Sequence, residues 1–119
     1  MSDDPNCVFC RIVRGELPSR KAHEDAEILV FHDIHPVAPM HLLMIPKRHI
    51  VSMAELADDD APLMGRMMVL ARQLAESQGS VGGFRLIANT GQIGRQDVYH
   101  LHFHLLGGDR PLPGMIAKV

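Results

Sequence analysis

The sequence has no tryptophan, and aromatic residues make up only 4% of its 119 residues. Leucine and methionine are therefore expected to fill the core where other proteins use aromatic rings. No stretch approaches the roughly 18 consecutive apolar residues of a membrane-spanning helix, and the acidic start MSDDPNC lacks the apolar segment of a signal peptide. We therefore expect a cytoplasmic protein with no membrane partner.

Neither sign of charge is in large excess, because the formal net charge is -2 and the lysines and arginines are scattered. A general nucleic-acid partner is not expected, since binding by phosphate neutralisation needs a basic patch. The sequence also lacks internal repeats and Gly/Ser-rich linkers. With 46% hydrophobic residues, a chain of this length fits one domain over residues 1–119 with a single core.

Hydrophobic periodicity predicts one short and one long helix. The short helix is expected at the start of segment 7–19, which stops at a glycine and a proline. The long helix is expected within 58–79, because Pro62 lies in its first turn and Gly79 follows its end. Apolar residues recur on one face of this segment at i, i+4, i+7 and i+11: Leu63, Met67, Leu70 and Leu74. This face is expected to pack on a sheet.

Segments rich in strand-forming residues predict the sheet. The first two strands are expected to pair as neighbours across a proline-marked turn, and the last two to be separated by a glycine-containing loop. The expected strands cover 27–34, 41–46, 84–91 and 98–108. Strands joined by turns, with one helix between the pairs, indicate an α+β fold on an antiparallel sheet.

Three histidines alternate with apolar residues in VYHLHFHLLGG: His100, His102 and His104. On a strand they would share one face, while Leu101 and Phe103 would face the core. The outer two would have Cα atoms roughly 13 Å apart, too far for all three rings to bind one zinc ion through bonds of about 2.1 Å. An anion such as phosphate fits better, with one imidazole as nucleophile and another as donor.

The loop before this row, TGQIGRQD, also suits a phosphate. Its glycines allow backbone N–H groups to approach an anion, and Arg95 and Gln96 add side-chain donors. A separate signal is the pair Cys7 and Cys10, the only cysteines of the chain. In a cytoplasmic protein this spacing indicates metal or redox ligands rather than a disulfide.

The segment HLHFHLL resembles the signature of the histidine triad family, His-x-His-x-His followed by two apolar residues. The segments FHDIHPVAPMHLLMIPKRHI, RLIANTG and RPLPGM are similar to other parts of that family, especially its bacterial nucleotide-binding branch. The resemblance implies an antiparallel sheet of about five strands with one long and one short helix. It also implies a homodimer whose sheet is continuous, with 107–119 as a C-terminal tail.

The activity implied by this resemblance is hydrolysis of purine nucleoside phosphoramidates. His102 would attack the α-phosphorus and form a covalent nucleotidyl-histidine, which water would then release as the monophosphate. His104 and Asn89 would contact the phosphate, Asp33 would bind the ribose hydroxyls, and Ile34 would help to form the base pocket. No catalytic cofactor is implied.

Other residues follow from the same resemblance. His41 would belong to the polar network that supports the triad. Asp97 replaces a serine that contacts the phosphate and leaving group in the best-known eukaryotic members, so it is expected to act on both. Arg95 stands before Gln96 where glycine is usual, and a positive φ at this position would strain or reshape the loop.

The resemblance also implies a structural zinc site, with two thiolates and two imidazoles as a tetrahedral set: Cys7, Cys10, His49 and His100. Two alternatives to the phosphoramidase remain open from the sequence. One is a nucleotide-binding regulatory module with little turnover, and the other is a zinc hydrolase with its metal at the triad.

Overall fold

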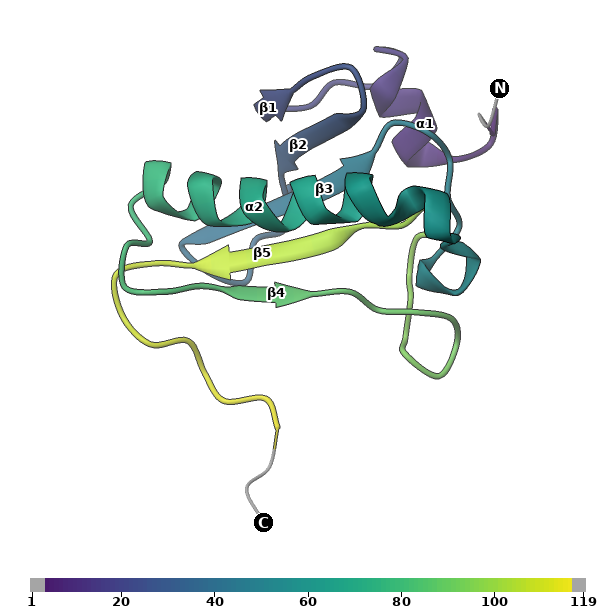
Figure 1. The fold of residues 1–119 in the computed structure, drawn as a ribbon. Coiled ribbons are helices and arrows are strands. Elements are labelled where there is room, and N and C mark those ends of the chain that lie inside the picture. The colour runs from purple at the N-terminus through teal and green to yellow at the C-terminus, as the bar shows by residue number, and fades with distance from the viewer. Residues whose placement is uncertain (1–3, 117–119) are drawn as a thin grey trace.

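The computed structural model describes residues 4–116 as one antiparallel sheet with a helix on each face (Figure 1). The strands lie in the order β1-β2-β3-β5-β4. In chain order the elements are α1 (Val8–Val13), β1 (Lys21–Glu24), β2 (Ile28–His32), β3 (Met40–Pro46), α2 (Ala61–Ser77), β4 (Arg85–Ile87) and β5 (Phe103–Gly107). Two single-turn 3-10 helices, Met53–Glu55 and Asp58–Asp60, lead into α2.

The predicted α+β class, the antiparallel sheet and the two helices are confirmed. The prediction for 98–108 was wrong in extent, because β5 begins only at Phe103 and residues 97–100 bend. His100 and His102 therefore precede the strand, although both rings still lie on the α1 side, where they contact Phe9, while Leu101 and Phe103 enter the core beneath α2. Strand β1 was not predicted from the sequence. The expected tail 107–119 is described only to residue 116, and residues 1–3 and 117–119 lie outside the described part.

Strands β2 and β3 are buried on both faces because alternate residues enter two different cores. One core joins the stripe of α2 to one face of the sheet, through residues such as Met67, Leu42 and Leu105. The second core lies on the opposite face, where Phe9 of α1 packs with Phe31 and neighbouring apolar side chains. This double burial explains why β2 and β3 read as nearly continuous apolar runs.

Helix α1 is short and carries its own N-terminal cap. The Cys7 sulfur accepts the backbone N–H of Cys10 at 3.3 Å, and Gly15 follows the helix with φ 80°. Six residues are too few for a helix that is stable alone in water, so α1 depends on what it packs against.

The antiparallel pairing of β3 with β5 sets the register of the site. His41 lies opposite Leu106, and Leu43 lies opposite His104. His41 and His104 are therefore diagonal neighbours on the face that α1 covers. Along residues 4–116, no helix combines the length and apolar character needed to cross a bilayer.

Candidate functional site

A cavity of about 330 Å³ opens on the α1 side of the sheet. Four of its polar side chains converge from different places: Asp33 follows β2, Asp97 and His102 precede β5, and His104 lies on β5. Its apolar wall comes mainly from α1 and the central strands, with Val8, Phe9, Ile12, Phe31 and Leu43. The combination of an apolar wall with a few convergent polar groups is typical of a small-molecule site.

His102 is held in one tautomer by the backbone. Its Nδ1 lies 2.8 Å from the carbonyl oxygen of His100, which can only accept, so Nδ1 carries the proton. In the neutral ring the lone pair is then on Nε2, which lies 3.4 Å from Oδ1 of Asp97. The edge of the Phe9 ring meets the buried His102 ring, with centroids 5.2 Å apart and planes at 87°. The ring is thus oriented as a nucleophile.

His104 is fixed by a relay that begins at another backbone group. The N–H of Val37 donates to Nδ1 of His41 at 3.1 Å, which leaves the proton of His41 on Nε2. That Nε2–H donates to Nδ1 of His104 at 2.9 Å, so His104 keeps its own proton on Nε2. His104 therefore contributes an N–H donor beside the nucleophile, and the rings of His102 and His104 lie 5.1 Å apart.

Burial keeps this relay neutral. Desolvation lowers the pKa of His41 below its usual 6.5, against the opposing effect of the Asp33 carboxylate. Burial is also the main cause that lowers the pKa of His104, and His102 and His41 lower it further. Both rings therefore remain uncharged at pH 7, as the assigned tautomers require.

Asp33 and Ile34 both line the cavity, as expected for residues that contact a nucleoside. One oxygen of Asp33 accepts the N–H of His35 at 2.8 Å, and the other lies 3.3 Å from Nε2 of His41. The side chain of Ile34 is 86% exposed, so it is free to contact a bound ligand. His32, at the end of β2, also lines the cavity.

Asn89 and Gln96, which are also expected at the phosphate, lie outside the cavity wall and bind backbone groups of the loop. Nδ2 of Asn89 donates to the carbonyl of Gly94 at 2.7 Å. Gln96 is buried, and its amide binds the backbone of Gly91, Val51 and Val98. These side chains shape the loop, and their contact with a phosphate stays a prediction.

Arg95 has φ 62°, the only positive φ of a non-glycine residue between residues 4 and 116. A left-handed conformation costs an L-residue roughly 1–2 kcal/mol. The neighbouring Gly94 is equally constrained, because a Cβ there would lie 2.5 Å from the carbonyl oxygen of Thr90. The strain expected for arginine at a position with positive φ is therefore present in this loop.

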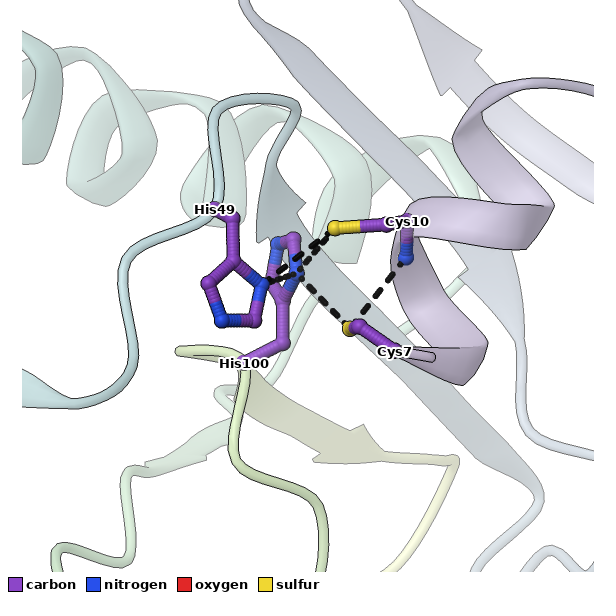
Figure 2. A group of neighbouring side chains, drawn as sticks. All are labelled: Cys7, Cys10, His49 and His100. Carbon is purple, nitrogen blue, oxygen red and sulfur yellow. Dashed lines mark hydrogen bonds between the residues drawn. The ribbon is translucent and has the colours of Figure 1, made fainter. Parts of the chain in front are cut away.

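The four expected metal ligands converge beside the cavity (Figure 2). Nδ1 of His100 lies 3.4 Å and 3.5 Å from the sulfurs of Cys7 and Cys10, and 3.2 Å from Nδ1 of His49. The Cys10 sulfur also lies 3.3 Å from Nδ1 of His49. Tetrahedral bonds of about 2.0–2.3 Å place neighbouring donor atoms roughly 3.3–3.8 Å apart. These four residues, hereafter the metal cluster, fit a zinc ion.

The tautomer of His100 also suits a metal. Its Nε2–H donates to the carbonyl oxygen of Pro46 at 2.7 Å, so the lone pair on Nδ1 points into the metal cluster. A second group, Asp33, His41 and His104, also has ligand atoms within 4.8 Å of one another. There, however, the proton on Nε2 of His41 occupies the nitrogen that a metal would need, so a hydrogen-bond relay fits better.

Sequence reasoning did not identify the apolar wall of the cavity. Val8, Phe9 and Ile12 were interpreted only as helix residues, because an apolar residue at helical spacing carries no sign of what it faces. Their position beside His102 follows from the docking of α1, which depends on contacts from distant parts of the chain.

Comparisons with known proteins agree with this geometry. A family model described as scavenger mRNA decapping enzyme C-term binding matches residues 6–119. Protein HitA of Neisseria gonorrhoeae is 45% identical over 102 residues, which cover 86% of this chain and 95% of that protein. The crystal structure of a HIT family hydrolase from Legionella pneumophila Philadelphia 1 is 47% identical, with a TM-score of 0.84 over 88% of this chain and 95% of its own. A histidine triad protein from Clostridium difficile is 39% identical, with a TM-score of 0.89 over 96% and 99% of the two chains.

The buried neutral relay predicts how stability changes with pH. Because the pKa of His41 is lower in the folded chain than its usual 6.5, the unfolded chain binds more protons as the pH falls below about 7. The free energy of unfolding should therefore fall from pH 7.5 to pH 5.5, and the fall should be smaller in His41→Gln. Urea denaturation at both pH values, with saturating zinc throughout, measures the difference. His35→Gln, a change at an exposed histidine outside the relay, should keep the wild-type dependence. If the free energy of unfolding falls by the same amount between pH 7.5 and pH 5.5 in the wild type and in His41→Gln, the neutral relay is contradicted.

Proposed function

The chain belongs to the histidine triad family, and on that premise we propose that it hydrolyses the P–N bond of purine nucleoside 5'-phosphoramidates. The observation that carries the proposal is the free Nε2 lone pair of His102 facing a cavity beside the neutral N–H donor of His104. A nucleophile and an anion-stabilising donor are the two groups that transfer of a nucleotidyl group needs. The Legionella relative, whose name describes a hydrolase, supports the same class of reaction.

In the first step, Nε2 of His102 attacks the α-phosphorus. A bond forms between this nitrogen and phosphorus, and the bond from phosphorus to the leaving nitrogen breaks. The positive charge that develops on the ring is stabilised by the hydrogen bond from Nδ1–H to the carbonyl of His100. The Nε2–H of His104 donates to a phosphate oxygen, where negative charge accumulates.

The leaving amine takes up one proton from solvent at the mouth of the cavity as it departs, and the second step returns one proton to solvent. Asp97 lies 3.4 Å from the attacking nitrogen and is largely exposed, so its carboxylate can hold the N–H of the amine at the mouth of the cavity. In the second step, water attacks phosphorus, releases the nucleoside monophosphate, restores His102 and gives up one proton. The two steps together consume one water molecule and leave the protonation of the protein unchanged.

Asp33 and Ile34 carry the nucleoside part of the proposal. A carboxylate at the cavity wall can accept hydrogen bonds from ribose hydroxyls, and the exposed Ile34 with the apolar wall can cover the base. Asn89, Arg95 and Gln96 are proposed to contact the phosphate, either directly or by shaping the loop that does. His41 acts as a positioning residue, because it reaches the phosphate only through His104.

Zinc in the metal cluster has a structural role in this proposal. Cys7, Cys10, His49 and His100 would supply all four ligands and leave no open position for a substrate. When bound, the ion would tie α1 to the segments that precede β5 and follow β3. The hydrolysis itself is carried by side chains of the cavity.

A regulatory module that binds nucleotide with little turnover is the second candidate. The observation that favours it is Arg95, whose positive φ strains the loop beside the phosphate site. Together with Asp97 at the leaving-group position, this could slow the chemical step while leaving nucleotide binding intact.

Turnover by His102→Ala separates these candidates. Removal of the nucleophile should lower the rate of hydrolysis of an adenosine phosphoramidate by about three orders of magnitude or more. Adenosine monophosphate should still bind, as isothermal titration calorimetry would measure. His23→Ala removes a histidine outside the cavity and should keep the wild-type rate. A wild-type rate no higher than that of His102→Ala, with binding retained, would leave only the regulatory module.

Metal analysis tests the structural zinc. The wild-type chain should hold about one zinc ion, and His49→Ala should lose most of it, because the cluster would keep only three ligands. Folded protein treated with a chelator should still hydrolyse saturating substrate. Loss of turnover at every substrate concentration after chelation would instead support a zinc hydrolase, and a metal-free wild-type chain would remove the structural site.

A homodimer is the remaining part of the proposal. β4 is an edge strand, and within residues 4–116 it pairs only with β5, so its outer N–H and C=O groups can pair with a second copy. Phe84, which is 44% exposed, lies beside this edge. Light scattering during size-exclusion chromatography should give the mass of two chains. The mass of one chain across the working concentration range would contradict the dimer.

A further inference from the structure

Helix α1 belongs to two sites at once. Its N-terminal turn holds two ligands of the metal cluster, Cys7 and Cys10. The same turn, together with the next, places Val8, Phe9 and Ile12 in the wall of the cavity. A displacement of this helix would therefore change the metal cluster and the cavity together.

Besides the metal cluster, side-chain packing holds α1 in place. In the described chain, backbone hydrogen bonds from the N–H groups of 7–16 stay within residues 4–16, so no backbone ladder joins α1 to the sheet. Phe9 is its main buried anchor, in edge contact with Phe31 at 5.6 Å and with His102 at 5.2 Å. A helix of six residues has little stability of its own, so its position depends on this anchor, on the packing of Ile12 and Val13 against the same core, and on the metal cluster.

The other two ligands of the metal cluster come from the body of the protein. His49 follows β3, and His100 precedes β5 and accepts the Nδ1–H of His102 through its carbonyl oxygen. A metal ion would thus join α1 to the segment that orients the nucleophile. Without the ion, the contacts that connect these groups include those of 3.2–3.5 Å among sulfur and ring nitrogen atoms and the ring contacts of Phe9 with His100 and His102.

We propose that a metal ion in the metal cluster raises the affinity of the cavity for a nucleoside monophosphate, with α1 as the coupling element. The proposal rests on the proposed function, since it takes the cavity as the nucleotide site and the cluster as the metal site. Metal binding fixes α1 and so completes the apolar wall before the nucleotide arrives. Because coupling between two binding sites is reciprocal, bound nucleotide must raise the affinity of the cluster for the metal by the same factor.

The test compares zinc-loaded protein with protein made metal-free by a chelator and then desalted. Calorimetric titration with adenosine monophosphate should give binding at least about fivefold weaker in the metal-free form, the lower end of typical coupling between sites. Zinc affinity, measured against a competing chromophoric chelator, should rise by the same factor when adenosine monophosphate is present. Circular dichroism establishes that both forms are folded.

Phe9→Leu tests the role of α1. Leucine keeps an apolar side chain but loses the ring that contacts Phe31 and His102. The affinity for adenosine monophosphate of the zinc-loaded form, divided by that of the metal-free form, should therefore fall toward one. Val69→Ala trims an apolar side chain at an exposed residue of α2, outside α1, the cavity and the β4 edge, and should keep the wild-type ratio. The wild-type comparison stands even if Phe9→Leu does not fold.

The outcomes separate the inference from the proposed function. Equal nucleotide affinity with and without zinc overturns the coupling and leaves the proposed function intact. An unchanged ratio in folded Phe9→Leu overturns α1 as the coupling element. If the zinc-loaded chain does not bind adenosine monophosphate, the nucleotide site and the coupling are both overturned. If the chain does not bind zinc, the metal cluster and the coupling are both overturned.

Discussion

The hydrogen bond of 2.8 Å from Nδ1 of His102 to the carbonyl of His100 is the interaction on which the rest of the site depends. A backbone carbonyl accepts only, so it determines which nitrogen of His102 carries the proton and which has the lone pair. The N–H of Val37 has the complementary effect on His41 and, through it, on His104. The proton pattern of the cavity is thus set by backbone groups, which do not titrate.

The bend before β5 gives the three triad histidines different surroundings. His100 turns its Nδ1 to the metal cluster, while its carbonyl orients His102. His104 alone lies within the strand, where the register with β3 places it beside His41. All three rings lie on the α1 side, since Phe9 contacts His100 and His102 and the His104 ring lies 5.1 Å from that of His102, so the metal cluster and the cavity are built next to each other on one face of the sheet.

The parts predicted well from the sequence are those with strong local signals. The stripe of α2 and the buried runs of β2 and β3 have clear periodicity, and the predicted ligand set of the metal cluster converges as the family resemblance implied. The length of β5 was overestimated because alternation continues through His100 and Leu101 although the chain bends, and the backbone N–H of Leu101 instead donates to Ile50 beyond the end of β3. The role of Phe9 was not predictable, because it depends on the packing of α1 against segments up to about 90 residues away.

The shortness of α1 has a consequence for the order of folding. The residues that hold this helix lie in β2, in β3 and near His49 and His100, so its partners are incomplete until nearly the whole chain is present. Contacts so distant in sequence cost loop-closure entropy before they contribute any stability. Helix α1 is therefore among the last elements to dock, and the cavity acquires its wall only when the sheet beneath it has formed.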